Sequence, residues 1–378
     1  MKNVTVGPIK DFVVGIYDGP HATPPESSEG PIFLGIQNVT EEGRLDLSKV
    51  RHIAERDFLR WTRRVTPQPG DIVFSYEATL HRYALIPEGF CGCLGRRLAL
   101  VRPDVSKIHS RFLYYYFLSP NWRAVVESNI LSGATVDRIP LKRFPQFEVQ
   151  IPPLSDQRRI ASLFSNYDEL IENNRRRIEL LEQAARLIYK EWFVDLRFPG
   201  HEQVKVIDGV PEGWVKAPLS EIAWLQYGKG LRADDRVPGQ YPVYGSSGVI
   251  GTHNKSLVSG PTIIVGRKGN VGSIFWSETD CYPIDTVYYI DSAQASLYLY
   301  YALDSIEFIS TDVAVPGLNR NFAHSRLVLL PPKEVSDQFE MTIAPLQAQV
   351  SVLIRHNEVL AQARDLLLPR LMNGEISV

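Results

Sequence analysis

Arginine and aromatic side chains are interleaved in the first part of this chain, a mixture typical of nucleic-acid-binding surfaces. Residues 60–64 read Arg-Trp-Thr-Arg-Arg, the densest basic cluster. Guanidinium groups contact phosphates and donate hydrogen bonds to base edges. An ordinary solvated surface, with arginine stems lying along apolar neighbours, is the alternative. The DNA-binding candidates here are Arg60, Arg63, Arg64, Tyr76, His81, Arg82, Tyr83, Arg96 and Arg97.

Glycine-rich loops with polar side chains mark the second part of the chain, at 244–251 and 265–272. The second loop has the spacing G-x-x-G-x-x-G, which differs from the dinucleotide-binding pattern G-x-G-x-x-G. Glycine lets a loop approach a phosphate backbone closely, but hairpin turns explain such glycines equally well. The candidates here are Tyr227, Lys229, Arg232, Ser246, Ser247, His253, Lys255, Arg267, Lys268 and Asn270.

Motifs for catalysis are absent from the sequence. It holds no phosphate-binding P-loop, no methyltransferase Asn/Asp-Pro-Pro-aromatic motif and no metal-ligand spacing. The cysteines Cys91, Cys93 and Cys281 form no ligand set, and we expect Cys91 and Cys93 to be buried thiols. We therefore predict a protein with no catalytic residues, no metal and no cofactor of its own. The formal net charge of −2 argues against a strongly basic DNA-coating protein.

A long amphipathic helix is predicted over residues 155–193, after Pro152 and Pro153. Ser155 is expected to cap it, with Asp156 in the first turn. Its apolar positions return in alternating steps of four and three residues, which is the pattern of a coiled-coil seam. These positions are Ile160, Phe164, Tyr167, Ile171, Asn174, Ile178, Leu181, Ala185, Ile188 and Trp192.

The partner of this seam lies near the C-terminus. The second seam consists of Phe339, Ile343, Leu346, Val350, Leu353, Asn357, Leu360, Leu367 and Leu371, with Arg364 in the remaining position. The sequence PPLSDQ at 152–157 returns as PPKEVSDQ at 331–338, so the chain is a duplication. Pro345 lies inside the second helix, where we expect a kink or a restart of the helix.

The two seams also predict a register. Polar residues in a coiled-coil core are best placed against each other, so Asn174 should face Asn357 in an antiparallel pair. Residues further along then face each other as follows: Ile178 and Leu353, Ile171 and Leu360, Phe164 and Leu367, Ile188 and Ile343, Trp192 and Phe339, and Tyr167 and Arg364. In the last pair the ring of Tyr167 can accept the guanidinium on its face.

These patterns predict an α+β fold with pseudo-two-fold duplication, in which two globular domains are joined by a long antiparallel coiled coil. The predicted parts are a first domain at 1–150, a long helix at 151–200, a second domain at 201–330 and a helical region at 331–378. No apolar run is long enough to span a membrane, and the N-terminus lacks the apolar core of a signal peptide. We expect a cytoplasmic protein.

Two such blocks, each followed by a helix that opens Pro-Pro and then Ser-Asp-Gln, closely resemble the specificity subunit of type I restriction–modification enzymes. Residues 17–38 and 242–251 look like the openings of target-recognition domains in that family. The resemblance covers essentially the whole chain. It implies that each domain reads one half of a bipartite target in double-stranded DNA, and that the coiled coil sets the spacer.

The resemblance also implies partners. Two methyltransferase subunits would dock on the helices, and restriction/translocase subunits would join them. S-adenosylmethionine, ATP and magnesium would belong to those subunits. The alternative is a coiled-coil adaptor with two protein-binding heads and no DNA, which would explain the helices but not the duplicated basic heads. Whether the system restricts or only modifies DNA stays open.

Overall fold

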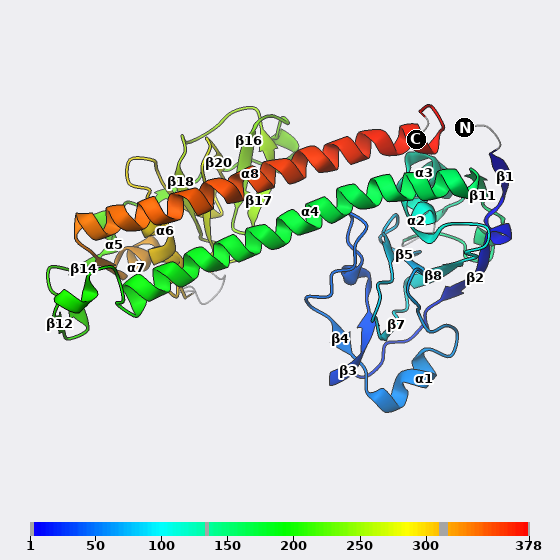
Figure 1. Ribbon diagram of the computed structural model, residues 1–378, viewed down its shortest axis with the longest axis horizontal. Helices are drawn as coiled ribbons and strands as arrows, with labels where there is room; N and C mark the ends of the chain where they lie inside the picture. Colours follow the sequence, from blue (N-terminus) through cyan, green and yellow to red (C-terminus); the bar gives the residue numbers. More distant parts are fainter. Residues whose placement is uncertain (1–3, 133–135, 310–316, 377–378) are drawn as a thin grey trace. The chain divides into compact units, whose positions relative to one another are not determined.

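The computed structural model describes residues 4–132, 136–309 and 317–376. The chain forms two compact units. Unit 1 contains Met1–Glu172 and Asn357–Val378, and unit 2 contains Asn173–His356. Each unit therefore holds one α+β block and one half of each long helix, α4 (Leu154–Tyr189) and α8 (Lys333–Met372) (Figure 1).

Unit 1 is built on a four-stranded antiparallel sheet of order β2-β8-β5-β6 and a three-stranded sheet of order β4-β3-β7. In the second sheet β3 pairs with β7 in parallel. The bounds are β2 Val13–Asp18, β3 Ser27–Leu34, β4 Arg51–His52, β5 Ile72–Ser75, β6 Tyr83–Leu85, β7 Gly92–Leu94 and β8 Leu98–Pro103. β8 and β5 are the two central strands of the four-stranded sheet.

Two helices, α2 (Ser110–Leu118) and α3 (Pro120–Glu127), pack beside the four-stranded sheet of unit 1. Pro120 is the first residue of α3 and separates the two helices. Two-stranded ladders, β1 (Thr5–Pro8) with β11 (Glu148–Ile151) and β9 (Leu131–Ser132) with β10 (Asp137–Arg138), and the short α1 (Phe58–Trp61) complete the block. The apolar core continues from this block into Ile160 and Phe164 of α4 and Leu368 and Leu371 of α8.

Unit 2 repeats this topology. Its sheets have the orders β15-β21-β18-β19 and β17-β16-β20, again with one parallel pair, β16 with β20. The bounds are β12 Val206–Ile207, β13 Val210–Pro211, β14 Val215–Pro218, α5 Leu219–Ile222, β15 Gln226–Tyr227, β16 Tyr241–Gly245, β17 Gly248–His253, β18 Thr262–Gly266, β19 Ile274–Ser277, β20 Tyr282–Pro283, β21 Val287–Ile290, α6 Leu297–Asp304, α7 Arg320–His324 and β22 Leu327–Leu330. The ladder β14·β22 corresponds to β1·β11, so the duplication predicted from sequence extends to the strand pairing.

The start of α4 is fixed by the Gln of the repeated motif rather than by a serine cap. The helix begins at Leu154, and the carbonyl of Pro153 accepts the first amide bonds, so Ser155 lies within the first turn and not at the cap position. Gln157 is buried, and its Oε1 accepts from the amide of His109 at 2.7 Å. Its Nε2 donates to the carbonyl of Pro152 at 2.8 Å. This amide thereby joins the helix to the block that precedes it.

Pro345 does not restart the second helix. α8 runs without interruption from Lys333 to Met372, through both Pro345 and Pro369. An interior proline costs roughly 3 kcal/mol. Phe339 and Ile343 before the proline are fully buried in the core of unit 2, and Val350 after it is buried as well. This packing offsets the cost by holding the helix on both sides of Pro345.

The two helices run antiparallel within each unit (Figure 1). In unit 2 the rings of Trp192 and Phe339 lie 5.8 Å apart, as the predicted register requires. In unit 1, Arg364 donates to Asp168 at 2.7 Å, so a carboxylate one position along takes the guanidinium that we expected on the ring of Tyr167. A charge-assisted hydrogen bond is the stronger interaction. The facing of Asn174 and Asn357 stays a prediction.

Apolar side chains also remain outside the seam. On the part of α4 in unit 2 and the turn after it, Leu180, Leu187 and Val194 are more than half exposed and recur every seven residues. Val352 and Ile354 of α8 are exposed in the same unit. Within the described ranges, no helix combines the length and hydropathy that a membrane span needs.

Candidate nucleic-acid interface

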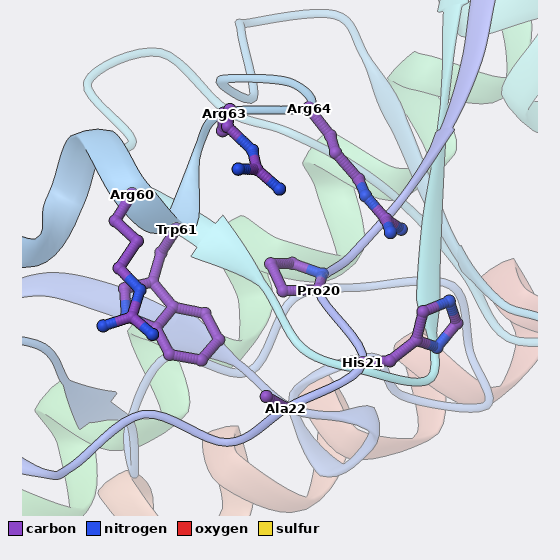
Figure 2. A pocket seen from close by; sticks show the side chains of 7 residues that line it. All are labelled: Pro20, His21, Ala22, Arg60, Trp61, Arg63 and Arg64. Carbon is purple, nitrogen blue, oxygen red and sulfur yellow. The ribbon is translucent and has the colours of Figure 1, made fainter.

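In unit 1, three of the predicted arginines line one hollow of about 330 Å³. Arg60 belongs to α1, and Arg63 and Arg64 follow it in the next loop. Figure 2 shows these side chains opposite the segment 20–22, with the ring of Trp61 beside Arg60. Several cations that share one hollow create a local positive potential suited to a phosphate.

Trp61 is the residue that positions this cluster. It is buried, and its ring packs edge-on against Phe33 at 6.4 Å, together with Ile53 and Cys93. A helix of four residues is too short to be stable alone, so this anchor holds α1 against the three-stranded sheet. The arginines on either side of the tryptophan are thereby kept at the surface.

A second hollow of about 330 Å³ is lined by Arg51, Arg96 and Arg97. Phe33 lines it as well, so the buried pair Phe33 and Trp61 lies behind both hollows. The loop that carries His21 and Ala22 at the first hollow continues directly to Thr23 at the second. The two hollows therefore adjoin.

The arginines differ in how they are paired. Arg64 bonds Asp18 at 2.5 Å, Arg51 bonds Glu26 at 3.1 Å and Arg97 lies 3.6 Å from Glu77. Arg60, Arg63 and Arg96 are exposed, and none of them has an ion-pair or hydrogen-bond partner for its side chain in the part of the chain that the structure describes. These three guanidinium groups are available to a ligand.

Four predicted residues of unit 1 lie elsewhere. Tyr83 is buried, with its hydroxyl accepting from Trp122 Nε1 at 3.0 Å, and burial raises its pKa. Tyr76 is buried and donates to the carbonyl of Arg96 at 2.8 Å. His81 lies 3.7 Å from Glu127, and burial lowers its pKa. Arg82 bonds Glu41 at 3.0 Å. Tyrosine occurs both in cores and at surfaces, so the residue type alone did not show that Tyr76 and Tyr83 would be buried.

In unit 2, the two glycine-rich loops meet. The turn between β16 and β17 carries Ser246 and Ser247, and Asn270 of the other loop donates to Ser247 Oγ at 3.2 Å. Gly272 has a φ of +77°, and an added Cβ would lie 2.6 Å from Phe308 Cβ, so glycine is required here by the backbone conformation and by the close approach of the segment after α6. Lys268 is exposed on the same loop, and its backbone bridges to Gly317.

Aromatic rings and guanidinium groups alternate beside this loop. The guanidinium of Arg320 lies 5.2 Å from the ring centroid of Trp224 and 4.9 Å from that of Tyr227. Arg267 lies 5.0 Å from Tyr227 and 5.7 Å from Tyr288. We call these five residues the stacked ladder. Cation–π contacts of this kind orient a guanidinium as well as stabilising it.

The remaining candidates of unit 2 lie outside the stacked ladder. Lys229, Arg232 and Lys255 are exposed, and their side chains have no ion-pair or hydrogen-bond partner among the described residues. His253 is buried, and its Nδ1 accepts from the amide of Val237 at 3.1 Å, so it supports the loop before β16.

Sequence reasoning missed Trp224 and Arg320. They are 96 positions apart by number and share no motif, and only the fold brings the segment before β15 against the start of α7. It also missed Arg51, which follows no glycine loop or basic run. No periodic signal could have found these side chains.

The cysteines do not form a site. Cys93 and Cys281 are buried, and burial raises their pKa to about 12 and about 11. Cys91 is exposed, contrary to our expectation of a buried pair. Across 4–132, 136–309 and 317–376, no cluster of His, Cys, Asp and Glu side chains has the arrangement that holds a metal ion.

Comparison with known families decides between DNA recognition and a protein adaptor. A family model described as "Type I restriction modification DNA specificity domain" matches residues 41–183 and again residues 211–339. The chain belongs to this family. Each match overlaps one of the duplicated blocks and runs into the long helix that follows it. Membership in the type I specificity family favours a role in DNA sequence specificity over the adaptor.

Other members of the type I specificity family extend over nearly all of the chain. The MjaIX specificity subunit of Methanocaldococcus jannaschii is 22% identical over 362 residues, covering 87% of this chain and 82% of the relative. The putative MjaX subunit of the same organism is 21% identical over 409 residues, covering 98% and 93%. The type I S subunit from M. genitalium has the same fold, with a TM-score of 0.57, 18% identity and coverage of 98% and 96%.

Proposed function

We propose that each block reads one half of a bipartite target in double-stranded DNA, and that the antiparallel helices set the unread spacer. The observation that carries the proposal is that the same strand topology presents two different basic surfaces: the hollows of unit 1 and the stacked ladder of unit 2. A duplicated protein can match a local dyad of DNA with its own pseudo-dyad. Different side chains on the two copies then read different half-sites.

Two methyltransferase subunits dock on the long helices in this proposal, and restriction/translocase subunits join the complex. The exposed stripe Leu180, Leu187 and Val194 supports a docking partner, because apolar side chains that recur on one helix face mark interaction surfaces. The seam of α4 is already covered by α8 within the same unit, so this second stripe is left for another chain.

The chain itself performs no catalytic step in this proposal. Methylation and ATP-dependent cleavage take place in the partner subunits, which bind S-adenosylmethionine, ATP and magnesium. The complex works in the cytoplasm, where it meets DNA.

Exchange of the first block tests the reading of half-sites. Residues 1–150 are replaced with the equivalent block of a relative, and the complex is expressed with its methyltransferase subunit. Methylome sequencing should show one changed half of a bipartite methyladenine motif, with the other half and the spacer retained. A second variant also exchanges 357–378, because Leu368 and Leu371 pack in unit 1.

Changes in both halves with either variant would contradict the proposal. A gel-shift assay with the methyltransferase subunit present separates it from the adaptor function. Under the adaptor function, the complex would bind a DNA fragment that carries the motif no more tightly than a scrambled fragment.

A further inference from the structure

The stacked ladder in unit 2 holds two guanidinium groups in fixed orientations. Arg320 lies against both Trp224 and Tyr227, and Arg267 lies against both Tyr227 and Tyr288. A ring contact on a guanidinium face leaves the N–H edges as the donors that can reach a ligand. The terminal N–H groups of Arg320 are therefore presented in a defined plane.

The segments that carry the ladder are held by hydrogen bonds. The amide of Trp224 donates to Gln294 at 3.0 Å, and that of Leu225 donates to His324 Nε2 at 3.0 Å. The hydroxyl of Tyr288 donates to the carbonyl of Leu318 at 2.9 Å, which fixes the chain just before α7. Nη1 of Arg267 donates to the carbonyl of Asp285 at 3.1 Å, which holds this guanidinium directly and leaves its other N–H groups for a ligand. The segments that carry both arginines are thus fixed before any ligand arrives.

Among the described residues, no carboxylate competes for Arg320. Its side chain has no carboxylate partner in the described residues, and its Nε is shielded from solvent without an acceptor there. The terminal nitrogens of Arg320 are therefore the atoms that can donate hydrogen bonds to a ligand. Trp224 and Tyr227, the rings that flank it, are each 49% exposed, so the group stands in a flat, partly apolar surface.

We propose that Arg320, with Arg267 beside it, reads guanine in the half-site bound by unit 2. This inference rests on the proposed function and names the residues that give it specificity. A planar fork of N–H donors matches the O6 and N7 acceptors of guanine in the major groove. The first hollow of unit 1 is different, because among the described residues none of its three arginines lies over the face of an aromatic ring. A cluster of cations around one cavity suits phosphate.

Substitution of Arg320 by lysine distinguishes a contact with guanine from a contact with phosphate. Arg320→Lys keeps the charge but loses the planar fork and its stacking. The variant is prepared as the complex with its methyltransferase subunit, and binding is measured on fragments in which each base pair of the second half-site is changed in turn. Discrimination at one G·C pair should fall about tenfold or more, while affinity for scrambled DNA stays within twofold.

Arg326→Lys is the matched control, because Arg326 stacks on Phe322 at 5.4 Å outside the ladder. It should discriminate as the unchanged complex does. Trp224→Ala provides a second, independent variant, since it removes a ring under Arg320 and leaves the guanidinium in place. It should weaken discrimination at the same base pair, with the first half-site unaffected.

Equal discrimination by Arg320→Lys and by the unchanged complex would overturn the inference and make Arg320 a phosphate contact. That result leaves the proposed function intact. The proposed function fails instead if the unchanged complex does not discriminate among second half-sites at all.

Discussion

Arg364 of α8 donates a hydrogen bond to Asp168 of α4 over 2.7 Å, and the other oxygen of the same carboxylate accepts from Tyr115 at 2.6 Å. Asp168 therefore links both long helices of unit 1 to helix α2. The Arg364 side chain is 20% exposed and that of Asp168 is 33% exposed, so the pair is only partly screened by water. This junction leads to a first prediction.

Arg364→Met should destabilise unit 1 by about 1–2 kcal/mol, because it leaves Asp168 half-buried without its cation. Urea denaturation measures the change, and a double-mutant cycle with Asp168→Asn isolates the pair. Asp365→Asn is the control, since that carboxylate also contacts Arg364 but is 63% exposed. Equal effects of Arg364→Met and Asp365→Asn would contradict the prediction.

The glutamine of the repeated motif should stabilise the protein in the first copy and have little effect on stability in the second. Gln157 is buried and bonds the backbone of His109 and Pro152, so Gln157→Leu leaves buried polar groups without partners. We expect a loss of about 1–3 kcal/mol in the free energy of unfolding. Gln338 occupies the equivalent place in the second motif and is exposed, so Gln338→Leu should change stability by less than about 0.5 kcal/mol. Chemical denaturation of both variants checks this.

Arg60 and Arg63 should contribute to the salt dependence of DNA binding. Neutralising both to glutamine should weaken binding to all sequences and reduce the slope of log affinity against log salt by roughly one unit per lost phosphate contact. Lys142→Gln with Arg143→Gln is the control, because these exposed cations of unit 1 line neither hollow. Filter binding over a series of salt concentrations gives the slopes. An unchanged slope for the variant of Arg60 and Arg63 would mean that these side chains do not contact phosphate.

The stability of unit 2 should depend on the protonation of His324. Its Nε2 accepts from the amide of Leu225, and burial and the nearby Arg320 lower its pKa below the ordinary 6.5. The folded state then binds fewer protons than the unfolded state, so the stabilisation is present above pH 6.5 and is lost as pH falls through the lowered pKa.

His324→Gln keeps an acceptor but does not titrate in this range. Urea midpoints measured at several pH values from 7.5 downward should therefore fall more steeply for the unchanged protein than for the variant. Parallel pH profiles would show that His324 does not titrate with folding.

The helix register can be tested inside unit 2 with cysteines. Ile178→Cys and Leu353→Cys should oxidise rapidly, because a disulfide needs Cα atoms within about 7 Å. Cys91→Ser is the only background change required, since Cys93 and Cys281 are buried and their raised pKa values make them unreactive. Faster oxidation of Ile178→Cys with Leu346→Cys would refute the register.

The sequence revealed the helices and the duplication because repeated apolar spacing is local information. The helix continues through Pro345, because the packing of Phe339 and Ile343 outweighs the break that the proline was expected to cause. The hollow of unit 1 was partly predictable, since Arg60, Arg63 and Arg64 lie in one short run.

The ladder was only partly predictable. Tyr227 and Arg267 were among the candidates, but Trp224 and Arg320 come from segments that share no motif with them. Tyr83 and His253 were misplaced for a different reason. Side chains with both a polar and an apolar part fit the surface and the core equally well, and only the surrounding fold decides between them.

The nesting of the units has a consequence for synthesis on the ribosome. Unit 2 is continuous from Asn173 to His356, whereas unit 1 is completed only by Asn357–Val378. Domains usually fold in the order in which they emerge. Here the first block must wait for Leu368 and Leu371, with part of its apolar core uncovered while about half of the polypeptide is still being made. A nascent chain stalled before residue 357 should therefore carry a finished second unit and an unfinished first one.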